Sequence, residues 1–452
     1  MTQLFLSVRL NARNAFLTIL AIVITLMANG CGREREEAPI ASPPTEAQAN
    51  QIPNSQDNSN SEEGATNKAN ETAQSESGTT SLSLEGTVVI WHSWTGAEAD
   101  AFNEILGRTQ TDHANLIIDT LFVAYSDLEE SYIDAVSSGG GPDLLLAPNW
   151  WLPNLIQGQS IAPLIDLMPT EELTRYWPAA VENLAVGGTP YGVPATVEVV
   201  SLYYNQSRVA PGALPKTTDE LLSLVRTNGS PGLGLYNSFY HLQWGLSAFG
   251  TQLLDGSGKA ILDQSPGTVQ YLLWLIQLDE SPGVYIDTDY GMLVERFKKG
   301  EYAFFVDGPW SLSELKEALG DQLQVALLPA GPIGQARPWL TSEGFFVNPN
   351  KGKDTQGLAA QVALELTDGE SGQLFLQIAR LLPATRGVQG PDPLLNGFMA
   401  QAEQAESMPS IPEIQQALGY GGDMLIKALN GVADPQEIVA ETTALINEAN
   451  NR

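Results

Sequence analysis

The chain has one cysteine and three histidines among its 452 residues. A single cysteine excludes an internal disulfide and a zinc site built from several thiolates. The histidines, His92, His113 and His241, are too few for a metal site made of several imidazoles. Composition therefore leaves little for metal chemistry or for a histidine proton relay.

Basic residues are also scarce. The chain has 22 Lys and Arg against 53 Asp and Glu, which gives a formal net charge of -31. Binding to nucleic acid or to anionic lipid depends on Lys and Arg that displace counterions, so we expect neither partner. Hydrophobic residues make up 43% of the chain, which is enough for a large core and excludes disorder throughout.

The first 30 residues have the pattern of a secretory signal peptide. Arg9 and Arg13 precede an apolar run, residues 15–27, that is shorter than the roughly 20 residues a membrane-spanning helix needs. A permanent membrane-anchoring helix is the alternative interpretation. The next four residues, Ala28-Asn29-Gly30-Cys31, resemble a bacterial lipobox, although leucine usually stands at the position of Ala28. The resemblance implies cleavage before Cys31 and lipidation of that cysteine.

Residues 31–82 differ sharply in composition from residues 83–452. They are rich in Ser, Asn, Gln, Thr, Glu, Ala and Pro and contain almost no aliphatic side chains. Such a segment cannot bury enough apolar area to offset its ordering entropy. We therefore expect a disordered tether between a lipidated cysteine and a globular part.

The globular part begins with alternating strand and helix patterns. We expect strands near residues 87–91, 116–123 and 143–146, a helix over 96–108, and a second helix that begins with a capping box at 126–129. This alternation predicts parallel α/β layers, and about 370 residues are too many for one ordinary core. Further helix starts are expected at the capping box Thr217–Glu220 and at Asp434-Pro435.

Sequence motifs of known enzyme classes are missing. The chain has no phosphate-binding loop ending in Lys, no Gly-x-Ser-x-Gly elbow and no His-Glu-x-x-His zinc helix. Residues 138–142, Ser-Gly-Gly-Gly-Pro, indicate the end of a helix before a strand. Paired carboxylates could be posed as a glycosidase site, but 53 acidic residues guarantee accidental pairs.

Several aromatic residues lie beside turn residues and outside apolar stripes. Trp94 precedes Thr-Gly, the pair Trp150-Trp151 is flanked by prolines, and Trp310 follows Asp-Gly-Pro. A single tryptophan is more often a packing residue, but two adjacent indoles in a Pro-flanked loop are hard to bury together. Pyranose rings present flat C–H faces that stack on indoles, and their hydroxyls need carboxylates, amides and tyrosines. The pattern favours a sugar-binding cleft.

These residues resemble a known family, the extracellular solute-binding proteins of bacterial ABC transporters, in particular the maltose/maltodextrin-binding type. The resemblance covers nearly the whole globular part in the same order. It is carried by Val89-Ile90-Trp91-His92-Ser93-Trp94-Thr95-Gly96, residues 141–143 with 149–151, 191–205, 214–221, 287–290 with 297–301, Asp307-Gly308-Pro309-Trp310, and 408–412.

The resemblance implies an α/β, two-lobed periplasmic-binding-protein fold with an interlobe cleft and hinge strands that cross near Glu198 and Thr341. Residues 83–197 and 343–390 would form the N-lobe, and residues 198–342 and 391–452 the C-lobe. Ligand would bind between the lobes. The ligand-binding residues carried over are Trp151 and Trp310 as stacking platforms, Glu198 as a hydroxyl acceptor, and Trp94, Trp150, Tyr240 and His241 as cleft-lining residues.

The chain departs from the maltose binders in two places. An ungapped match puts Leu418 where those proteins have a late aromatic platform, and Tyr420 lies two residues further on. Some maltose binders also have a charged pair where this chain has Trp150 and Trp151. More aromatic and fewer charged contacts would favour longer or differently shaped glucans.

The sequence thus predicts a lipid-anchored receptor outside the cytoplasmic membrane that delivers an oligosaccharide, of maltodextrin type, to an ABC importer. We expect a monomer that works with the importer's membrane subunits, with no metal, no cofactor and no catalysis. Alternatives are a receptor for a polyol, glycerol phosphate or peptide, a surface glycoside hydrolase or lyase, and a tethered adhesin. Glycerol phosphate would need an Arg-rich cleft, which the candidate loops lack.

Overall fold

The computed structural model describes residues 83–227 and 229–452, which belong to one unit, Thr79–Arg452. The predicted signal peptide (1–30), the predicted lipidation site Cys31 and the predicted tether (31–82) lie outside the described residues. Across 83–227 and 229–452, no helix is both long enough and apolar enough to cross a membrane.

The first lobe is built on a mixed sheet with the strand order β13-β6-β12-β3-β1-β2, in which the short β14 also pairs with β12. β1 pairs in parallel with both β2 and β3, whereas β12 runs antiparallel to β3 and β6. The strands are β1 (Glu85–His92), β2 (Asn115–Phe122), β3 (Leu144–Pro148), β6 (Gly192–Val199), β12 (Trp339–Val347), β13 (Leu382–Pro383) and β14 (Glu406–Ser407).

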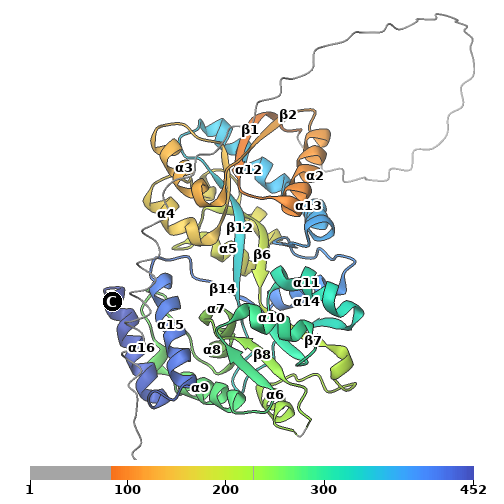
Figure 1. The fold of residues 1–452 in the computed structure, drawn as a ribbon. Helices are drawn as coiled ribbons and strands as arrows, with labels where there is room; N and C mark the ends of the chain where they lie inside the picture. Colours follow the sequence, from red (N-terminus) through yellow and green to blue (C-terminus); the bar gives the residue numbers. More distant parts are fainter. Residues whose placement is uncertain (1–82, 228) are drawn as a thin grey trace, which may run out of the picture. The chain divides into compact units, whose positions relative to one another are not determined.

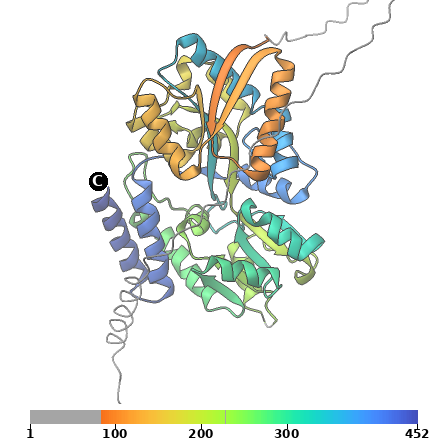
Figure 2. The same cartoon turned by 45° about the horizontal axis from the view of Figure 1, so that its top comes forward.

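Helices cover both faces of this sheet, as expected for an α/β protein. Its helices are α2 (Gly96–Asp112), α3 (Tyr125–Ser137), α4 (Leu152–Gln157), α5 (Pro178–Asn183), α12 (Lys353–Glu365) and α13 (Gly369–Leu374). α2 and α12 pack with one set of alternating strand residues, and α3 and α4 pack with the other set. Figure 1 and Figure 2 show α2 beside β1 and β2. A short hairpin, β4 (Ala185–Val186) with β5 (Thr189–Pro190), precedes β6.

The second lobe has a sheet with the order β11-β7-β10-β8-β9. β8 pairs in parallel with both β9 and β10, and β7 is antiparallel to β10 and β11. The strands are β7 (Ser201–Asn205), β8 (Leu233–Tyr236), β9 (Val284–Asp287), β10 (Phe304–Asp307) and β11 (Leu323–Ala326).

The helices of the second lobe also pack on both faces of their sheet. They are α6 (Thr218–Val225), α7 (Phe239–Leu242), α8 (Trp244–Ala248), α9 (Pro266–Asp279), α10 (Tyr290–Lys298), α11 (Leu312–Leu319), α14 (Pro393–Ala402), α15 (Ile414–Leu429) and α16 (Pro435–Ala449). α10, α11 and α14 contribute to the cluster that contains Tyr203 and Phe305, and α9, α15 and α16 to the cluster that contains Phe304 and Val306. The C-terminal α15 and α16 lie side by side in both views (Figure 1, Figure 2).

Two strands carry the chain from one sheet to the other. β6 ends at Val199 and β7 begins at Ser201, so a single residue separates a strand of the first sheet from a strand of the second. β12 pairs antiparallel with β6, and Thr341 lies directly opposite Glu198 in the ladder. The predicted crossing strands near Glu198 and Thr341 are therefore confirmed. The predicted lobe boundary after residue 197 falls two residues before the end of β6.

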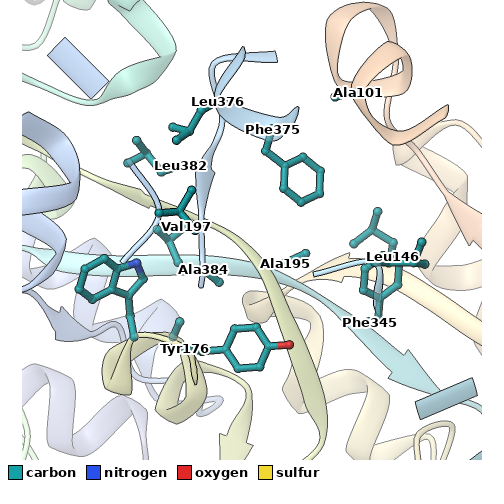
Figure 3. Packing of buried hydrophobic residues seen from close by; sticks show 14 of the residues in the cluster. Ala101, Leu146, Tyr176, Ala195, Val197, Phe345, Phe375, Leu376, Leu382 and Ala384 are labelled. Atoms are coloured by element: carbon teal, nitrogen blue, oxygen red, sulfur yellow. The ribbon is translucent and has the colours of Figure 1, made fainter. Parts of the chain in front are cut away.

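The core of the first lobe brings together side chains that are far apart in the sequence. Phe345 and Val197 are almost completely buried, and burying one large apolar side chain stabilises a fold by roughly 1.5–3 kcal/mol. Figure 3 shows part of this core, with Ala101, Leu146, Tyr176, Ala195, Val197, Phe345, Phe375, Leu376, Leu382 and Ala384 gathered around the strands.

Local sequence signals placed several helix ends correctly. Thr217 caps α6 with the expected reciprocal capping box to Glu220, and Asp434 caps α16 with Pro435 in its first turn. The predicted capping box at 126–129 is wrong, because α3 begins earlier, after Ala124, and no side chain caps it. The glycine run 138–142 does follow the end of α3, and Gly139 and Gly141 have positive φ angles that suit this stop.

Candidate ligand-binding site

In both lobes, aromatic residues follow the carboxyl ends of the parallel strands. In open α/β sheets, ligands bind outside this edge of the sheet. The first lobe places Trp94 after β1, Tyr125 after β2 and Trp150 with Trp151 after β3, and the second lobe places Tyr240 after β8, Tyr290 after β9 and Trp310 after β10.

The second-lobe aromatics form a connected cluster around Trp310, which is 41% exposed. The Trp310 Nε1–H donates to the Tyr290 hydroxyl at 3.1 Å, and that hydroxyl donates to Asp307 Oδ2 at 2.8 Å. The rings of His241 and Tyr240 lie 5.7 Å and 6.3 Å from the indole. The indole is thus held in place at one edge while much of the residue stays open.

His241 lies beneath this cluster and is buried. Its Nδ1 is 3.2 Å from the Ser238 hydroxyl and its Nε2 is 3.4 Å from Asp307 Oδ1. Its ring also meets Tyr236 edge to face at 4.8 Å. These contacts on several sides indicate that His241 holds the exposed aromatic side chains in place.

The adjacent tryptophans of the first lobe have different environments. Trp150 is 38% exposed and its Nε1–H donates to the Tyr125 hydroxyl at 3.0 Å, whereas Trp151 is only 6% exposed. Trp151 packs among Leu128, Leu145 and other residues of the cluster between the sheet and α3 and α4, with the Tyr125 ring 5.2 Å away. An indole with so little free surface offers no face to a sugar. Of the adjacent pair, Trp150 is the indole with an open face, whereas Trp151, which was predicted as a stacking platform, is buried.

Trp94 is likewise buried, at 4% exposure, between the rings of Phe102 and Phe375. It is therefore not an open stacking surface as a cleft-lining role would suggest. Its Nε1–H donates to Glu343 Oε2 at 2.5 Å. Trp94 acts through this bond, since it fixes the position of a carboxylate on β12.

A cavity of about 150 Å³ lies against the paired strands β6 and β12. Thr341 opposes Glu198 and Glu343 opposes Thr196, so the strand alternation puts these four side chains on one face of the sheet. The cavity lining consists of Glu98, Trp150, Thr196, Val197, Glu198, Thr341, Ser342, Glu343 and Leu381.

Tyr240 connects this cavity to the aromatic cluster of the second lobe. Its ring lies 6.3 Å from that of Trp310, and Glu198 is close enough to raise the pKa of the Tyr240 hydroxyl, after the larger effect of burial. Of the seven predicted binding residues, Trp150, Glu198, Tyr240, His241 and Trp310 therefore form one connected set. Trp94 and Trp151 are buried and contact residues next to this set, Glu343 and Tyr125 respectively.

A family model described as bacterial extracellular solute-binding protein matches residues 99–397. The chain belongs to this family. The solute-binding protein is 24% identical over 353 residues to a maltotriose-binding protein of Pyrococcus abyssi, with 74% of this chain and 75% of that protein covered. It is 24% identical over 341 residues to a maltooligosaccharide ABC transporter solute-binding lipoprotein of Streptococcus pneumoniae, covering 69% and 77%.

Solved structures have the same fold. An extracellular solute-binding protein from Staphylococcus aureus in complex with maltose matches with a TM-score of 0.72 and 20% identity, over 81% of this chain and 98% of that one. A cyclo/maltodextrin-binding protein complexed with maltotetraose matches with a TM-score of 0.71 and 21% identity, over 80% and 97%. The two-lobed fold predicted from the sequence is confirmed.

The carboxyl groups of the solute-binding protein's cavity are electrostatically unusual. Burial raises the pKa of Glu198 to about 7, and the neighbouring Glu98 carboxyl adds to this shift. Burial also raises the pKa of Glu343 to about 7; the Trp94 N–H opposes the shift, while Glu198 and Glu98 increase it. The pKa of Glu98 is raised by burial as well. Near neutral pH, Glu198 and Glu343 therefore hold protons that an exposed carboxyl would have lost.

These pKa values predict how stability depends on pH. The Glu343 carboxyl has an ordinary pKa near 4.5 and a pKa of about 7 in the folded protein. Its ionisation therefore destabilises the fold progressively as the pH rises from about 4.5 to about 7. One pKa unit corresponds to about 1.4 kcal/mol, so we expect Glu343→Gln to remove about 2–3 kcal/mol of this loss. Urea unfolding of both proteins at pH 4.5 and pH 8 measures the difference. The variant keeps the slope contributed by Glu406, whose pKa is also about 7; equal losses in both proteins would contradict the prediction.

Gly308 permits the observed position of the Trp310 indole. A Cβ atom at Gly308 would overlap the six-membered ring of that indole, although the φ angle of -99° is open to any residue. We therefore expect Gly308→Ala to displace the indole and to weaken ligand binding about tenfold, a loss of roughly 1.4 kcal/mol. Isothermal titration calorimetry measures the affinity, and Gly352→Ala is the control, because a Cβ there meets nothing within 4 Å. Equal affinities in the two variants would refute this role.

Sequence reasoning missed four residues of this site: Glu98, Tyr125, Tyr290 and Glu343. The position of Tyr125 and Tyr290, just after β2 and β9, was an available signal. Nothing in the local sequence marks Glu343, which is recognisable only from its pairing with β6.

Leu418 and Tyr420, at the predicted position of the late aromatic platform, belong to α15 and pack against the core of the second lobe. In the part of the chain that the structure describes, no group of His, Cys, Asp and Glu is arranged to hold a metal ion.

Proposed function

We propose that this solute-binding protein is a receptor that binds a maltodextrin-type oligosaccharide and delivers it to an ABC importer. The observation that carries the proposal is the pair of half-exposed indoles, Trp150 and Trp310, at the carboxyl edges of the two sheets. Glu198 and Tyr240 lie between them in the connected set described above. Flat aromatic faces together with hydroxyl-binding carboxyls suit a neutral sugar with several rings.

The relatives support this substrate class. The proteins from Pyrococcus abyssi and Streptococcus pneumoniae are named for maltotriose and maltooligosaccharides, and the structural neighbours hold maltose and maltotetraose. In the proposed site Trp150 and Trp310 stack on sugar rings, and Glu198 accepts hydrogen bonds from hydroxyl groups. His241, Trp94 and Trp151 keep these side chains in position.

We further propose that the chain is anchored outside the cytoplasmic membrane through a lipid on Cys31 and acts as a monomer with the membrane subunits of the importer. The support is the sequence around Cys31 and the lipoprotein name of the Streptococcus pneumoniae relative. Metabolic labelling with a fatty acid, compared between the chain and Cys31→Ala, tests the anchor.

Titration with a set of sugars tests the receptor function. Maltose, maltotriose and maltotetraose are added to the protein, and binding is followed by tryptophan fluorescence and calorimetry, with glycerol phosphate, a polyol and a peptide as competing solute classes. We expect saturable binding of the maltooligosaccharides and recovery of each sugar intact after incubation. Binding of another class alone would refute the sugar assignment. Release of new reducing ends over time would refute a receptor without catalysis.

A further inference from the structure

The cavity beside β6 and β12 has a one-sided charge. Three carboxyl groups line it, Glu98 from α2, Glu198 from β6 and Glu343 from β12, and no Lys or Arg is among its lining residues. Beside Tyr240, which is close to Glu198, the second lobe contributes Asp307 and His241 of the aromatic cluster. A ligand that reaches this cavity therefore meets carboxyl groups from three different elements and no fixed positive charge.

We propose that Glu343, together with Glu198, makes this site selective for oligosaccharides that carry a protonated amine in place of one hydroxyl. This inference rests on the proposed function, because it concerns the same cleft and refines the class of sugar. Glu343 is its specificity-determining residue.

Strand geometry supports the two-carboxyl arrangement. Glu343 and Glu198 are diagonal neighbours on one face of an antiparallel pair, where side chains are about 7 Å apart and within reach of a shared partner. The Trp94 N–H binds one oxygen of Glu343 and orients the carboxylate. An ammonium group has three donors, so it can bind Glu343 and Glu198 at once.

Burial explains why an amine would be preferred. Two carboxyl groups in a small cavity resist ionisation, and the raised pKa values of Glu198 and Glu343 express this resistance. A cation between them compensates the charge that burial disfavours. A hydroxyl group carries no charge and compensates less, and an anionic sugar is repelled.

A buried hydroxyl next to the cavity also lacks a partner. The Tyr240 hydroxyl oxygen is buried close to Glu198 and Thr341, yet within the described residues none of its contacts has the geometry of a hydrogen bond. Buried polar groups are normally paired, so the Tyr240 hydroxyl indicates that a polar ligand completes the site.

Amine binding would be linked to proton release. Near neutral pH the Glu198–Glu343 pair holds a proton; when the ammonium enters, both carboxyls ionise and that proton passes to solvent, while the ammonium keeps its own. Affinity for an amino sugar should therefore rise as pH increases through about 7, until the amine itself loses its proton. Affinity for a neutral sugar should not rise in this way.

Calorimetry on the full chain tests the inference. The probes are maltotriose and a set of maltotrioses in which the 6-hydroxyl of each ring in turn is replaced by an amino group or, separately, oxidised to a carboxylate. At pH 7.5 we expect at least one amino derivative to bind ten or more times tighter than maltotriose, and every carboxylate derivative to bind more weakly. Titrations in two buffers of different ionisation enthalpy should show proton release only with the amino derivative.

Two variants assign the effect to Glu343. In Glu343→Gln we expect the affinity ratio of amino derivative to maltotriose to fall close to one, whereas Glu406→Gln, which removes another carboxyl of raised pKa outside the cavity, should keep the ratio. Circular dichroism verifies that both variants are folded. The inference is overturned if maltotriose binds and no amino derivative binds better, or if Glu343→Gln keeps the ratio. Binding of amino derivatives without binding of maltotriose would instead overturn the neutral-sugar assignment and leave this inference standing.

Discussion

Replacing Trp310 with alanine is expected to weaken oligosaccharide binding about 100-fold. The indole is half exposed, and its bond to Tyr290 holds it in one orientation. A preoriented aromatic platform loses little entropy when a sugar ring stacks on it, and such anchors commonly contribute about 2 kcal/mol or more to binding. A 100-fold loss corresponds to about 2.7 kcal/mol. Calorimetric titration with maltotriose measures it.

Leu273→Ala is the matched control for this experiment. Leu273, on α9, is 43% exposed, close to the 41% of Trp310, so both variants remove an exposed apolar side chain. We expect the control to bind maltotriose like the unmodified protein. Because Trp310 is half exposed, its removal should change the melting temperature little. An unchanged affinity in Trp310→Ala would contradict the proposed site.

Replacing Trp151 with alanine is expected to destabilise the first lobe by about 3–5 kcal/mol, the usual cost of truncating a buried aromatic side chain. Trp151 lies in the cluster between β3, α3 and α4, so its removal leaves a cavity there. Urea unfolding followed by circular dichroism measures the loss. A loss below about 1 kcal/mol would show that Trp151 is not a packing residue.

The neighbouring Trp150→Ala is the natural control. Trp150 has a half-exposed indole, and its only described hydrogen bond is the one to Tyr125. We expect this variant to lose less than about 1 kcal/mol of stability and to bind maltotriose more weakly. Of the two adjacent substitutions, Trp151→Ala should therefore lower stability more, and Trp150→Ala should lower affinity for maltotriose more. The reverse outcome would restore Trp151 as the stacking residue.

Features with short-range causes could be predicted from the sequence. The β-branched run at 87–91 lies in β1, and the caps at Thr217 and Asp434 begin α6 and α16. Each of these signals depends on residues within one turn of helix or one strand. The order of family-like segments added the two-lobed arrangement, which no local signal contains.

The roles of individual tryptophans could not be predicted in this way. Trp150 and Trp151 are neighbours in the same Pro-flanked segment, and their exposure differs because α3 and α4 cover only one of them. Glu343 was missed for a related reason, since its importance arises from the β6–β12 pairing, which joins strands that are distant in the sequence. Long-range packing decides which of several equivalent side chains is free to meet a ligand.

The pairing of Glu198 with Thr341 places a proposed ligand-binding carboxyl close to the crossing between the two sheets. Glu198 lies two residues before Val200, the one residue that separates β6 of the first sheet from β7 of the second. We therefore expect a rotation of one lobe against the other to change the direction of this carboxyl. A substitution near Glu198 that alters ligand affinity should also alter the opening and closing of the lobes, and variants that change one property should be screened for the other.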